Sequence, residues 1–258
     1  MHWRGDTKVQ NTGMSVGPSA AVFNGRIFCF HQGGGNNGEL WFNVYEGGDR
    51  WWGDARVPNT GMLAGPSAVV FNNEIYVFHQ GGGDNGELWY NVFNGDRWLG
   101  DNKIPNTGTS AGPSAVIYNG QIYVFHQGSR NNGELWYNVF NGSRWLGDTQ
   151  VANTGMSASP TATHVSHNNT IQVLHQGGGD NGELWYNTFD GSRWLGDQRV
   201  QNVGISAAPS GVTFGEKVFC FHQGSSFNGE MWVNTFNGEF WEGDQRVPNT
   251  GMSSDPSA

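Results

Sequence analysis

The chain has 258 residues, of which 14% are charged, with 22 acidic against 13 basic side chains and a formal net charge of −9. An average soluble domain has roughly 25% charged residues, so a charged helical surface does not organise this one. The negative charge opposes binding to phosphate backbones and anionic membranes, and we expect no nucleic-acid partner. With 41 glycines and 14% aromatic residues, the chain should fold around a large apolar core with many tight turns.

Targeting, redox and metal signals are sparse. No apolar run approaches the ~18 residues that span a bilayer, and Met1 to Asp6 lacks the pattern of a secretory signal. We therefore expect a soluble chain without membrane insertion, either secreted or cytoplasmic. The two cysteines have no metal or C-x-x-C spacing, so no cofactor and no metal site are expected. Cys29 and Cys220 replace an apolar strand residue and are predicted to be buried free thiols.

Three phrases recur along the chain, and they decide the fold prediction. His-Gln-Gly begins at His31, His79, His126, His175 and His222, and Asn-Gly-Glu-(Leu/Met)-Trp ends at Trp41, Trp89, Trp136, Trp185 and Trp232. Both sets advance in steps of 48, 47, 49 and 47 residues. A third phrase, Trp-x-Gly-Asp, occurs once more than the others and begins at Trp3, Trp51, Trp98, Trp145, Trp194 and Trp241.

In chain order, a copy of an outer strand within residues 3–17 comes first, then five units, and then a second copy of that segment within 241–255. The units span residues 18–57, 66–104, 113–151, 160–200 and 209–247. Each unit reads as four short strands rich in β-branched and aromatic residues, and the second has them at 67–71, 75–80, 87–93 and 97–104. Asn and Gly in the reversals accept the positive φ that hairpin turns require.

Four antiparallel strands in about 47 residues, repeated five times, predict an all-β fold: a five-bladed β-propeller of four-stranded blades. An open β-solenoid is the rival architecture, but its rungs are shorter. One of the two outer-strand copies is surplus in a five-bladed ring. The surplus copy belongs to a longer array, stays loose, or pairs with another chain to form an oligomer.

The long polar loops, between the second and third strands and after the fourth, fall at one end of every blade, where recognition usually occurs. His, Gln, Asn, Glu and Trp side chains recur at that end. An indole beside a carboxylate, an amide and an imidazole suits a neutral sugar, because the indole packs on the ring while the polar groups bind hydroxyls. The candidate ligand-binding residues are His31, Gln32, Asn37, Glu39, Trp41, His79, Gln80, Asn85, Glu87, Trp89, His126, Gln127, Asn132, Glu134, Trp136, His175, Gln176, Asn181, Glu183, Trp185, His222, Gln223, Asn228, Glu230 and Trp232.

Other functions explain part of the pattern. Repeated His, Gln and Asp side chains can instead join one blade to the next, and we prefer that role for the Asp of Trp-x-Gly-Asp and for the His and Gln of His-Gln-Gly. A glycosidase needs carboxyl groups whose pKa values are pushed apart by different surroundings, whereas identical blades give identical surroundings. In a scaffold that binds one large protein partner, we expect the loops on the binding face to differ from blade to blade, whereas these loops are nearly alike. We therefore predict a non-catalytic protein with up to five equivalent sites, and glycans or glycoconjugates as partners.

The Trp-rich repeat of about 47 residues, with one polar set per unit, resembles the sugar-binding β-propeller lectins of the tachylectin and tectonin type and their microbial relatives. The resemblance covers the whole chain and lies in the architecture, since the motifs of those families do not recur residue by residue, and no binding residue is carried over. It implies a multivalent agglutinin with sites in or between the blades.

Overall fold

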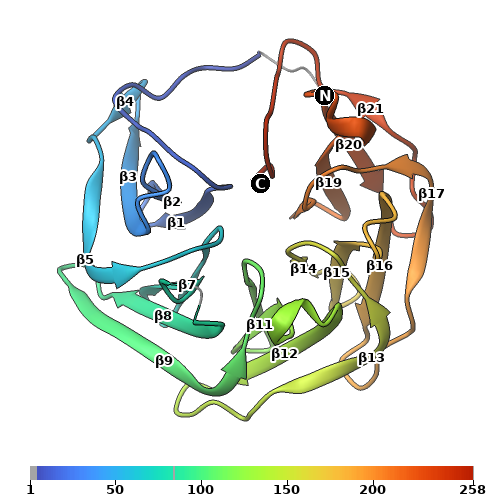
Figure 1. Ribbon diagram of the computed structural model, residues 1–258, viewed down its shortest axis with the longest axis horizontal. Coiled ribbons are helices and arrows are strands. Elements are labelled where there is room, and N and C mark those ends of the chain that lie inside the picture. Colours follow the sequence, from blue (N-terminus) through green and yellow to red (C-terminus); the bar gives the residue numbers. More distant parts are fainter. Residues whose placement is uncertain (1–4, 84, 258) are drawn as a thin grey trace.

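Five antiparallel sheets stand around a common axis, which confirms the predicted five-bladed β-propeller (Figure 1). The structure is a computed structural model that describes residues 5–83 and 85–257. The first strand of each blade lies nearest the axis and the fourth lies at the rim. Trp3, which opens the first outer-strand copy, lies outside the described residues.

The strands follow the chain from the axis to the rim. Blade 1 contains β1 (Ser19–Phe23), β2 (Arg26–Gln32), β3 (Glu39–Gly47), β4 (Arg50–Trp51) and β5 (Ala55–Gly61). Blade 2 contains β6 (Ser67–Phe71), β7 (Glu74–Gln80), β8 (Glu87–Phe93) and β9 (Trp98–Gly108). Blade 3 contains β10 (Ser114–Tyr118), β11 (Gln121–Gln127), the short 3-10 helix η1 (Ser129–Asn131), β12 (Glu134–Phe140) and β13 (Thr149–Gly155). Blade 4 contains β14 (Thr161–Val165), β15 (Thr170–Gln176), β16 (Glu183–Phe189) and β17 (Gln198–Gly204). Blade 5 contains β18 (Ser210–Phe214), β19 (Lys217–Gln223), the 3-10 helix η2 (Ser225–Phe227), β20 (Met231–Phe236) and β21 (Gln245–Arg246).

The predicted strands match these bounds closely, and the main difference is at the rim. In blade 2 the fourth strand continues to Gly108 instead of ending at Ile104. The added residues pair with the start of the third strand, where Glu87 opposes Gly108 across a bulge. In blade 1 the rim strand is divided into β4 and β5, both paired with β3.

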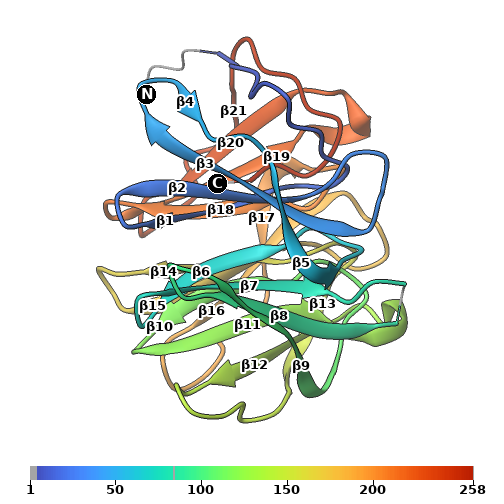
Figure 2. The same cartoon turned by 90° about the vertical axis from the view of Figure 1, so that its left-hand side faces the viewer.

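The second strands of blades 2, 3 and 4 are largely buried because their sheets are covered on both faces by neighbouring blades. In β7 only Glu74 is partly exposed, and the remaining residues through Gln80 are buried. A short, continuous apolar run between turn residues is the pattern that such a doubly covered strand requires. The tight turns gather on the left of Figure 2 and the longer loops on the right.

In blades 2 to 5, the Trp that opens Trp-x-Gly-Asp packs against the preceding blade. Trp98 of blade 2 packs edge-on against Phe30 of blade 1, with ring centroids 6.0 Å apart and planes inclined by 84°. Such pairs contribute about 0.5–1.5 kcal/mol beyond the apolar area that they bury. The same contact recurs from Trp145 to Phe78 and from Trp194 to Phe125. Trp241 instead packs against Tyr186 in the third strand of blade 4, because Leu174 stands at the position of Phe30.

The two chain ends lie together in the gap between blade 5 and blade 1. The N-terminal segment crosses the rim and turns inward to β1, and the C-terminal segment runs from the rim to the axis (Figure 1). The backbone N–H of Gly251 donates to Asp6 Oδ2 at 3.3 Å. Asp255 lies between the two blades, because its Oδ1 accepts from the Ala208 N–H at 2.9 Å and a Cβ on Gly17 would meet its backbone oxygen at 3.2 Å.

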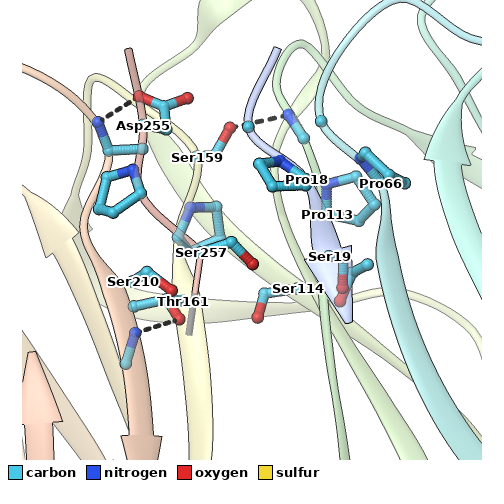
Figure 3. Close-up of a pocket in the computed structure, with 18 of the residues that line it drawn as sticks. Pro18, Ser19, Pro66, Pro113, Ser114, Ser159, Thr161, Ser210, Asp255 and Ser257 are labelled. Carbon is cyan, nitrogen blue, oxygen red and sulfur yellow. Dashed lines mark hydrogen bonds between the residues drawn. The ribbon is translucent and has the colours of Figure 1, made fainter. Parts of the chain in front are cut away.

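The Pro-Ser dipeptides surround the axis and connect the first strands of successive blades (Figure 3). The hydroxyl of Ser67 accepts a hydrogen bond from the Ala115 N–H of the next blade at 2.9 Å. Ser19, Ser114 and Thr161 accept in the same way. This contact between blades depends on strand positions that only the closed fold sets, so the sequence alone did not indicate it.

Candidate functional site

The polar residues of the repeat divide into an interior set and a surface set. His79 and Gln80 are buried, while Asn85 is exposed and Glu87 and Trp89 are half-buried at the loop end of blade 2. The same division holds in the other four blades. The structure thus brings together three of the five predicted residue types at the surface.

The buried imidazole lies in a polar network between blades. His79 Nε2 is 2.9 Å from Asp101 Oδ1, and its Nδ1 is 3.2 Å from the carbonyl oxygen of Gln80. His31, His126, His175 and His222 make the equivalent contacts. A buried polar group must be paired, and each ring nitrogen lies within hydrogen-bond distance of an oxygen inside the blade. The structure therefore places His31, His79, His126, His175 and His222 inside the blades, where they contact the Asp of Trp-x-Gly-Asp.

Gln80 and its copies are also used internally. The side-chain amide of Gln80 donates to the carbonyl oxygen of Thr109 at 3.4 Å, which fixes the loop after the fourth strand. Gln32, Gln127 and Gln223 donate to Met62, Met156 and Met252 in the same way. Gln176 is likewise buried. We leave the glutamines, like the histidines, out of the proposed site, because their side chains are buried.

The Asp of Trp-x-Gly-Asp has the structural role that we preferred. Asp148 Oδ1 accepts from Asn138 Nδ2 of its own blade at 3.1 Å and from the hydroxyl of Thr107 in the preceding blade at 3.1 Å. In blade 1 the hydroxyl of Thr12, in the N-terminal segment, donates to Asp54 at 3.0 Å. The Asn-Thr-Gly phrase thus supplies a hydroxyl to the next blade.

At the surface, the carboxylate of Glu39 accepts hydrogen bonds from an amide and an indole and pairs with a cation. Glu39 Oε2 accepts from Asn37 Nδ2 at 3.2 Å and from Trp41 Nε1 at 3.3 Å. Its other oxygen accepts from Arg56 Nη1 at 2.6 Å. We call this set the Asn–Glu–Trp cluster. Blades 2, 3 and 4 repeat the contacts of the indole and the amide with the carboxylate, and blade 5 repeats that of the amide.

The cation was not among the predicted site residues. Lys103, Arg199 and Arg246 pair with the clusters of blades 2, 4 and 5, and blade 3 has Gln150 at the equivalent place. A sequence signal was present, since a basic residue stands two positions after the Asp of Trp-x-Gly-Asp in four of the five blades. Lys103, followed by the indole of Trp89, holds the pKa of Glu87 below its usual range, so this carboxylate is ionised at neutral pH.

A glycine keeps the cluster together. A Cβ on Gly81, the third residue of His-Gln-Gly, would lie 2.7 Å from Asn85 Oδ1 and 2.8 Å from Trp89 Cδ1. The amide and the indole occupy the space that any side chain would need. The invariant Gly of the five His-Gln-Gly phrases therefore follows from the packing of the Asn–Glu–Trp cluster.

A different cleft lies between blades 1 and 2 on the side of the tight turns. Its volume is about 640 Å³, and Trp52, Arg26, Arg97 and Asp96 are among its lining residues. The Arg26 guanidinium lies over the Trp52 ring, 4.9 Å from its centroid. Trp52 is the only Trp outside the repeated phrases, so the indole of this cleft has no copy in the other blades.

The cavity at the axis is smaller, about 150 Å³, and is lined mainly by the Pro-Ser dipeptides. Asp255 is the one carboxylate among its lining residues. Burial raises the pKa of this carboxyl, although the N–H of Ala208 opposes the shift. The described residues include no group of three His, Cys, Asp or Glu side chains placed to hold a metal ion. Within the same residues, no helix has the length and apolarity to cross a membrane.

Comparison with solved structures shows similar propellers. AofleA from Arthrobotrys oligospora has a TM-score of 0.75 at 12% identity, over 96% of this chain and 76% of that one. The Aleuria aurantia lectin, described as a six-bladed β-propeller with a novel fucose recognition mode, has a TM-score of 0.68 at 15% identity, over 97% and 86% of the two chains. The NanB sialidase of Streptococcus pneumoniae has a TM-score of 0.71 at 10% identity, over 96% and 63%.

Neither a protein-family model nor a curated protein sequence matches the chain. Identities this low show the fold alone. The ligand must therefore be inferred from the residues of the site. The similar folds include lectins and a sialidase, so both binding and hydrolysis of sugars occur on this architecture. In fold, the chain is similar to the sugar-binding β-propeller lectins, as its repeat predicted.

Proposed function

We propose that the protein is a non-catalytic, multivalent lectin that binds glycans at the loop ends of its blades. The observation that carries the proposal is the repetition of Asn, Glu and Trp at the surface of all five blades, with the indole bonded to the carboxylate in blades 1 to 4. The site residues are Asn37, Glu39, Trp41, Asn85, Glu87, Trp89, Asn132, Glu134, Trp136, Asn181, Glu183, Trp185, Asn228, Glu230 and Trp232. Weak sites that repeat in this way gain avidity on a surface coated with glycans.

The cluster has free hydrogen-bonding capacity of the kind that hydroxyl groups need. A carboxylate accepts about four hydrogen bonds, and a lysine ammonium has three donors. In blade 2, Glu87 accepts hydrogen bonds from Asn85, Trp89 and Lys103, which leaves an acceptor on the carboxylate and two donors on the ammonium. Two neighbouring sugar hydroxyls fit such a pair, because each hydroxyl both donates and accepts.

The indole supplies the apolar part of the site. Trp89 is half-buried, and its N–H is fixed by Glu87 at 3.1 Å. A Trp held in one orientation offers a rigid apolar face at low entropic cost. A pyranose ring has such an apolar face beside its hydroxyls, which supports a sugar rather than a charged ligand.

Hydrolysis of a sugar is the alternative function, because a sialidase has a similar fold. A glycosidase usually uses two carboxyl groups in different surroundings. The five clusters each hold one carboxylate, and Asp255 is the one carboxyl that lines the axial cavity. The geometry therefore favours binding, and a glycosidase assay on the same sugars decides between the two functions.

The test is a glycan array followed by titration calorimetry with the best neutral sugar. We expect several sites per chain, and Glu87→Gln should lower the stoichiometry by about one because distant sites act independently. Glu216→Gln changes an exposed acid in the tight turn of blade 5 and should leave the titration unchanged. Absence of binding to every glycan would reject the lectin function, and turnover of a glycoside would replace it by hydrolysis.

A second pair of variants tests where the sugar binds. Trp52→Ala removes the exposed indole of the cleft between blades 1 and 2 and should leave the stoichiometry unchanged. If Trp52→Ala abolishes binding while Glu87→Gln does not, the protein is still a lectin, but the loop-end site is wrong.

A further inference from the structure

The cleft between blades 1 and 2 differs in chemistry from the Asn–Glu–Trp clusters. Its volume is about 640 Å³, within the range of roughly 300–1,000 Å³ that is usual for small-molecule sites. Its apolar lining consists largely of aromatic rings, which are those of Phe28, Phe42, Trp52, Phe93 and Trp98. A sugar needs polar partners for its hydroxyl groups, and aromatic rings do not supply them. The cleft therefore favours a ligand that is apolar over much of its surface.

The cleft lies on one face of β2. Arg26 and Phe28 line it together, because alternate residues of a strand share a face. Cys29 lies on the opposite face, which points away from blade 2, and it is only partly buried, whereas its copy Cys220 is buried. The prediction that both thiols are buried is therefore wrong for Cys29.

Blade 1 has apolar residues at a place where the other blades have a polar side chain. Phe42 in β3 is paired with Ala55 in β5. In blade 4 the equivalent residues are Tyr186 and Gln198, and the Tyr186 hydroxyl donates to Gln198 Oε1 at 2.7 Å. The pairs in blades 2, 3 and 5 are Tyr90 with Asn102, Tyr137 with Thr149, and Val233 with Gln245. The methyl group of Ala55 thus leaves the ring of Phe42 open to the cleft.

The charge beside the cleft is also reversed relative to blade 2. Arg26 begins β2, and Glu74 begins β7 at the equivalent place. Glu74 accepts a hydrogen bond from the Tyr76 hydroxyl at 3.4 Å, whereas the guanidinium of Arg26 lies over the ring of Trp52 at 4.9 Å. The residues at the position of Trp52 in the other blades are Leu99, Leu146, Leu195 and Glu242. Blade 1 therefore places a cation beside an indole where blade 2 has an acid and a leucine.

The indole of Trp52 is held in place although it is 55% exposed. Its Nε1 donates to Glu46 Oε2 at 3.1 Å, and Glu46 Oε1 lies 3.3 Å from Arg50 Nε. A guanidinium beside an aromatic ring still has N–H donors at its edge for a carboxylate. The fixed indole and the arginine are thus arranged in advance for a ligand that is both aromatic and anionic.

The charges that line the cleft favour an anion. Among the residues that the structure describes, Arg26 and Arg97 form no ion pair, whereas Arg56 belongs to the Asn–Glu–Trp cluster of blade 1. Asp54 accepts hydrogen bonds inside blade 1, so Asp96 is the lining carboxylate left to oppose two cations. A local excess of positive charge in a chain with a formal net charge of −9 attracts a negatively charged ligand.

We propose that this cleft binds an aromatic carboxylic acid, at one site per chain. The rings of the ligand would pack against Trp52 and Phe42, where aromatic pairs contribute more than the area that they bury. Its carboxylate would bind Arg26 and Arg97, because a guanidinium holds a carboxylate through parallel N–H donors. The proposal goes beyond sugar binding and does not depend on it, since the cleft lies on the side of the tight turns and the clusters lie at the loop ends (Figure 2).

The probe is 2-naphthoate, titrated into the whole chain in a calorimeter. We expect saturable binding of one naphthoate per chain. The uncharged analogue 2-naphthamide has the same rings and should bind roughly ten-fold more weakly, because it lacks the charge-assisted hydrogen bonds. Glucuronate has the charge on a sugar ring and should bind more weakly than naphthoate. No saturable binding of naphthoate, equal binding of naphthamide, or tighter binding of glucuronate would each overturn the proposal.

A variant that copies another blade locates the ligand. Ala55→Gln introduces the side chain that blade 4 has at Gln198, and it should abolish naphthoate binding by filling the space beside Phe42. Thr149→Gln makes the same change at the equivalent position of blade 3 and should leave naphthoate binding unchanged. If Ala55→Gln and Thr149→Gln bind naphthoate alike, the ligand does not occupy this cleft and the proposal is wrong.

A second variant tests the role of the charge. Arg26→Gln should weaken naphthoate roughly ten-fold and leave naphthamide unchanged, because only the carboxylate uses the guanidinium. Arg144→Gln removes an exposed arginine of blade 3 and should change neither titration. The sugar titration of both variants should match that of the wild type, which separates this site from the loop-end clusters. Equal affinity of Arg26→Gln and the wild type for naphthoate would contradict the assigned anion site.

Discussion

The hydroxyl of Thr107, at the end of blade 2, lies 3.1 Å from Asp148 Oδ1 of blade 3 and 3.1 Å from Asn138 Nδ2 of the same blade. This contact makes a buried polar network continuous between neighbouring sheets. Repeat proteins are stabilised largely through such interfaces between neighbours. The network explains, without a role in ligand binding, why Thr, Asn, His and Asp recur at fixed positions.

Thr107→Val should lower the free energy of unfolding by about 1 kcal/mol, because Asn138 and Asp148 each lose one hydrogen bond but keep the other. Blade 4 provides the natural control, since Val203 stands where the other blades have Thr and Asn234 then bonds Asp244. Val203→Thr should raise stability by a similar amount. Urea denaturation measures both changes, provided that the dependence of the free energy on urea concentration (the m value) stays the same. An unchanged free energy of unfolding for Thr107→Val would show that the network does not couple the blades.

Gly81→Ala should disrupt the Asn–Glu–Trp cluster of blade 2, because the added methyl group would meet Asn85 and Trp89 at less than 3 Å. We expect the sugar stoichiometry to fall by about one and the Trp fluorescence to change. Gly82→Ala is the matched control, since its Cβ would meet the nearest atom at 3.4 Å and its φ is not positive. Equal sugar binding by both variants would mean that this cluster does not contact the ligand.

Blade 3 should hold the weakest of the five sites, because Gln150 replaces the cation that faces Glu134. Gln150→Arg adds a guanidinium that can pair with the carboxylate and with a hydroxyl. Titration of the variant should show one more tight site, or one site of roughly ten-fold higher affinity. Thr149→Arg, at the adjacent exposed position, adds the same charge and should have no effect.

The fold could be predicted from the sequence because the repeat is nearly exact in its turn and strand residues. The four strands of blade 2 followed from alternating turn signals, and β6 and β8 have the predicted bounds. The path of the chain ends could not be predicted. The segments 3–17 and 241–255 have the same sequence pattern, so the sequence does not tell which of them serves as the outer strand of a blade. Contacts such as that of Asp255 with Ala208 and Gly17 decide it, and they join residues far apart in the chain.

The candidate site was predicted in part. Asn85, Glu87 and Trp89 meet at the surface because alternate residues of one strand share a face. His79 and Gln80 were placed beside them because they also end a strand at the loop end. Their side chains turn inward, however, since Asp101 and the carbonyl oxygen of Thr109 supply partners inside the blade. Lys103 was missed because its approach to Glu87 depends on the register of β8 and β9.

Stability should depend on pH through Asp255, whose pKa is raised in the folded chain because burial disfavours its charged form. A raised pKa means that the folded state binds more protons than the unfolded state. The ionised carboxylate therefore destabilises the fold at neutral pH, and the destabilisation disappears as the pH falls through the folded pKa to the ordinary value. Asp255→Asn, which keeps an oxygen to accept from Ala208, should be more stable than the wild type at pH 7 and equally stable in acid.

Asp190 should behave in the opposite way in the same assay. Hydrogen bonds from Arg193 and Ser192 lower the pKa of this exposed turn carboxyl to about 2. Its ionised form thus stabilises the fold above the ordinary pKa of Asp, and the effect is lost as the pH falls towards 2. Asp190→Asn reproduces the Asn found at this turn in blades 2, 3 and 5 and should be slightly less stable than the wild type at pH 7. Chemical denaturation between pH 3 and pH 7 measures both variants, and the same sign for the two would contradict the assigned position of Asp255 between the blades.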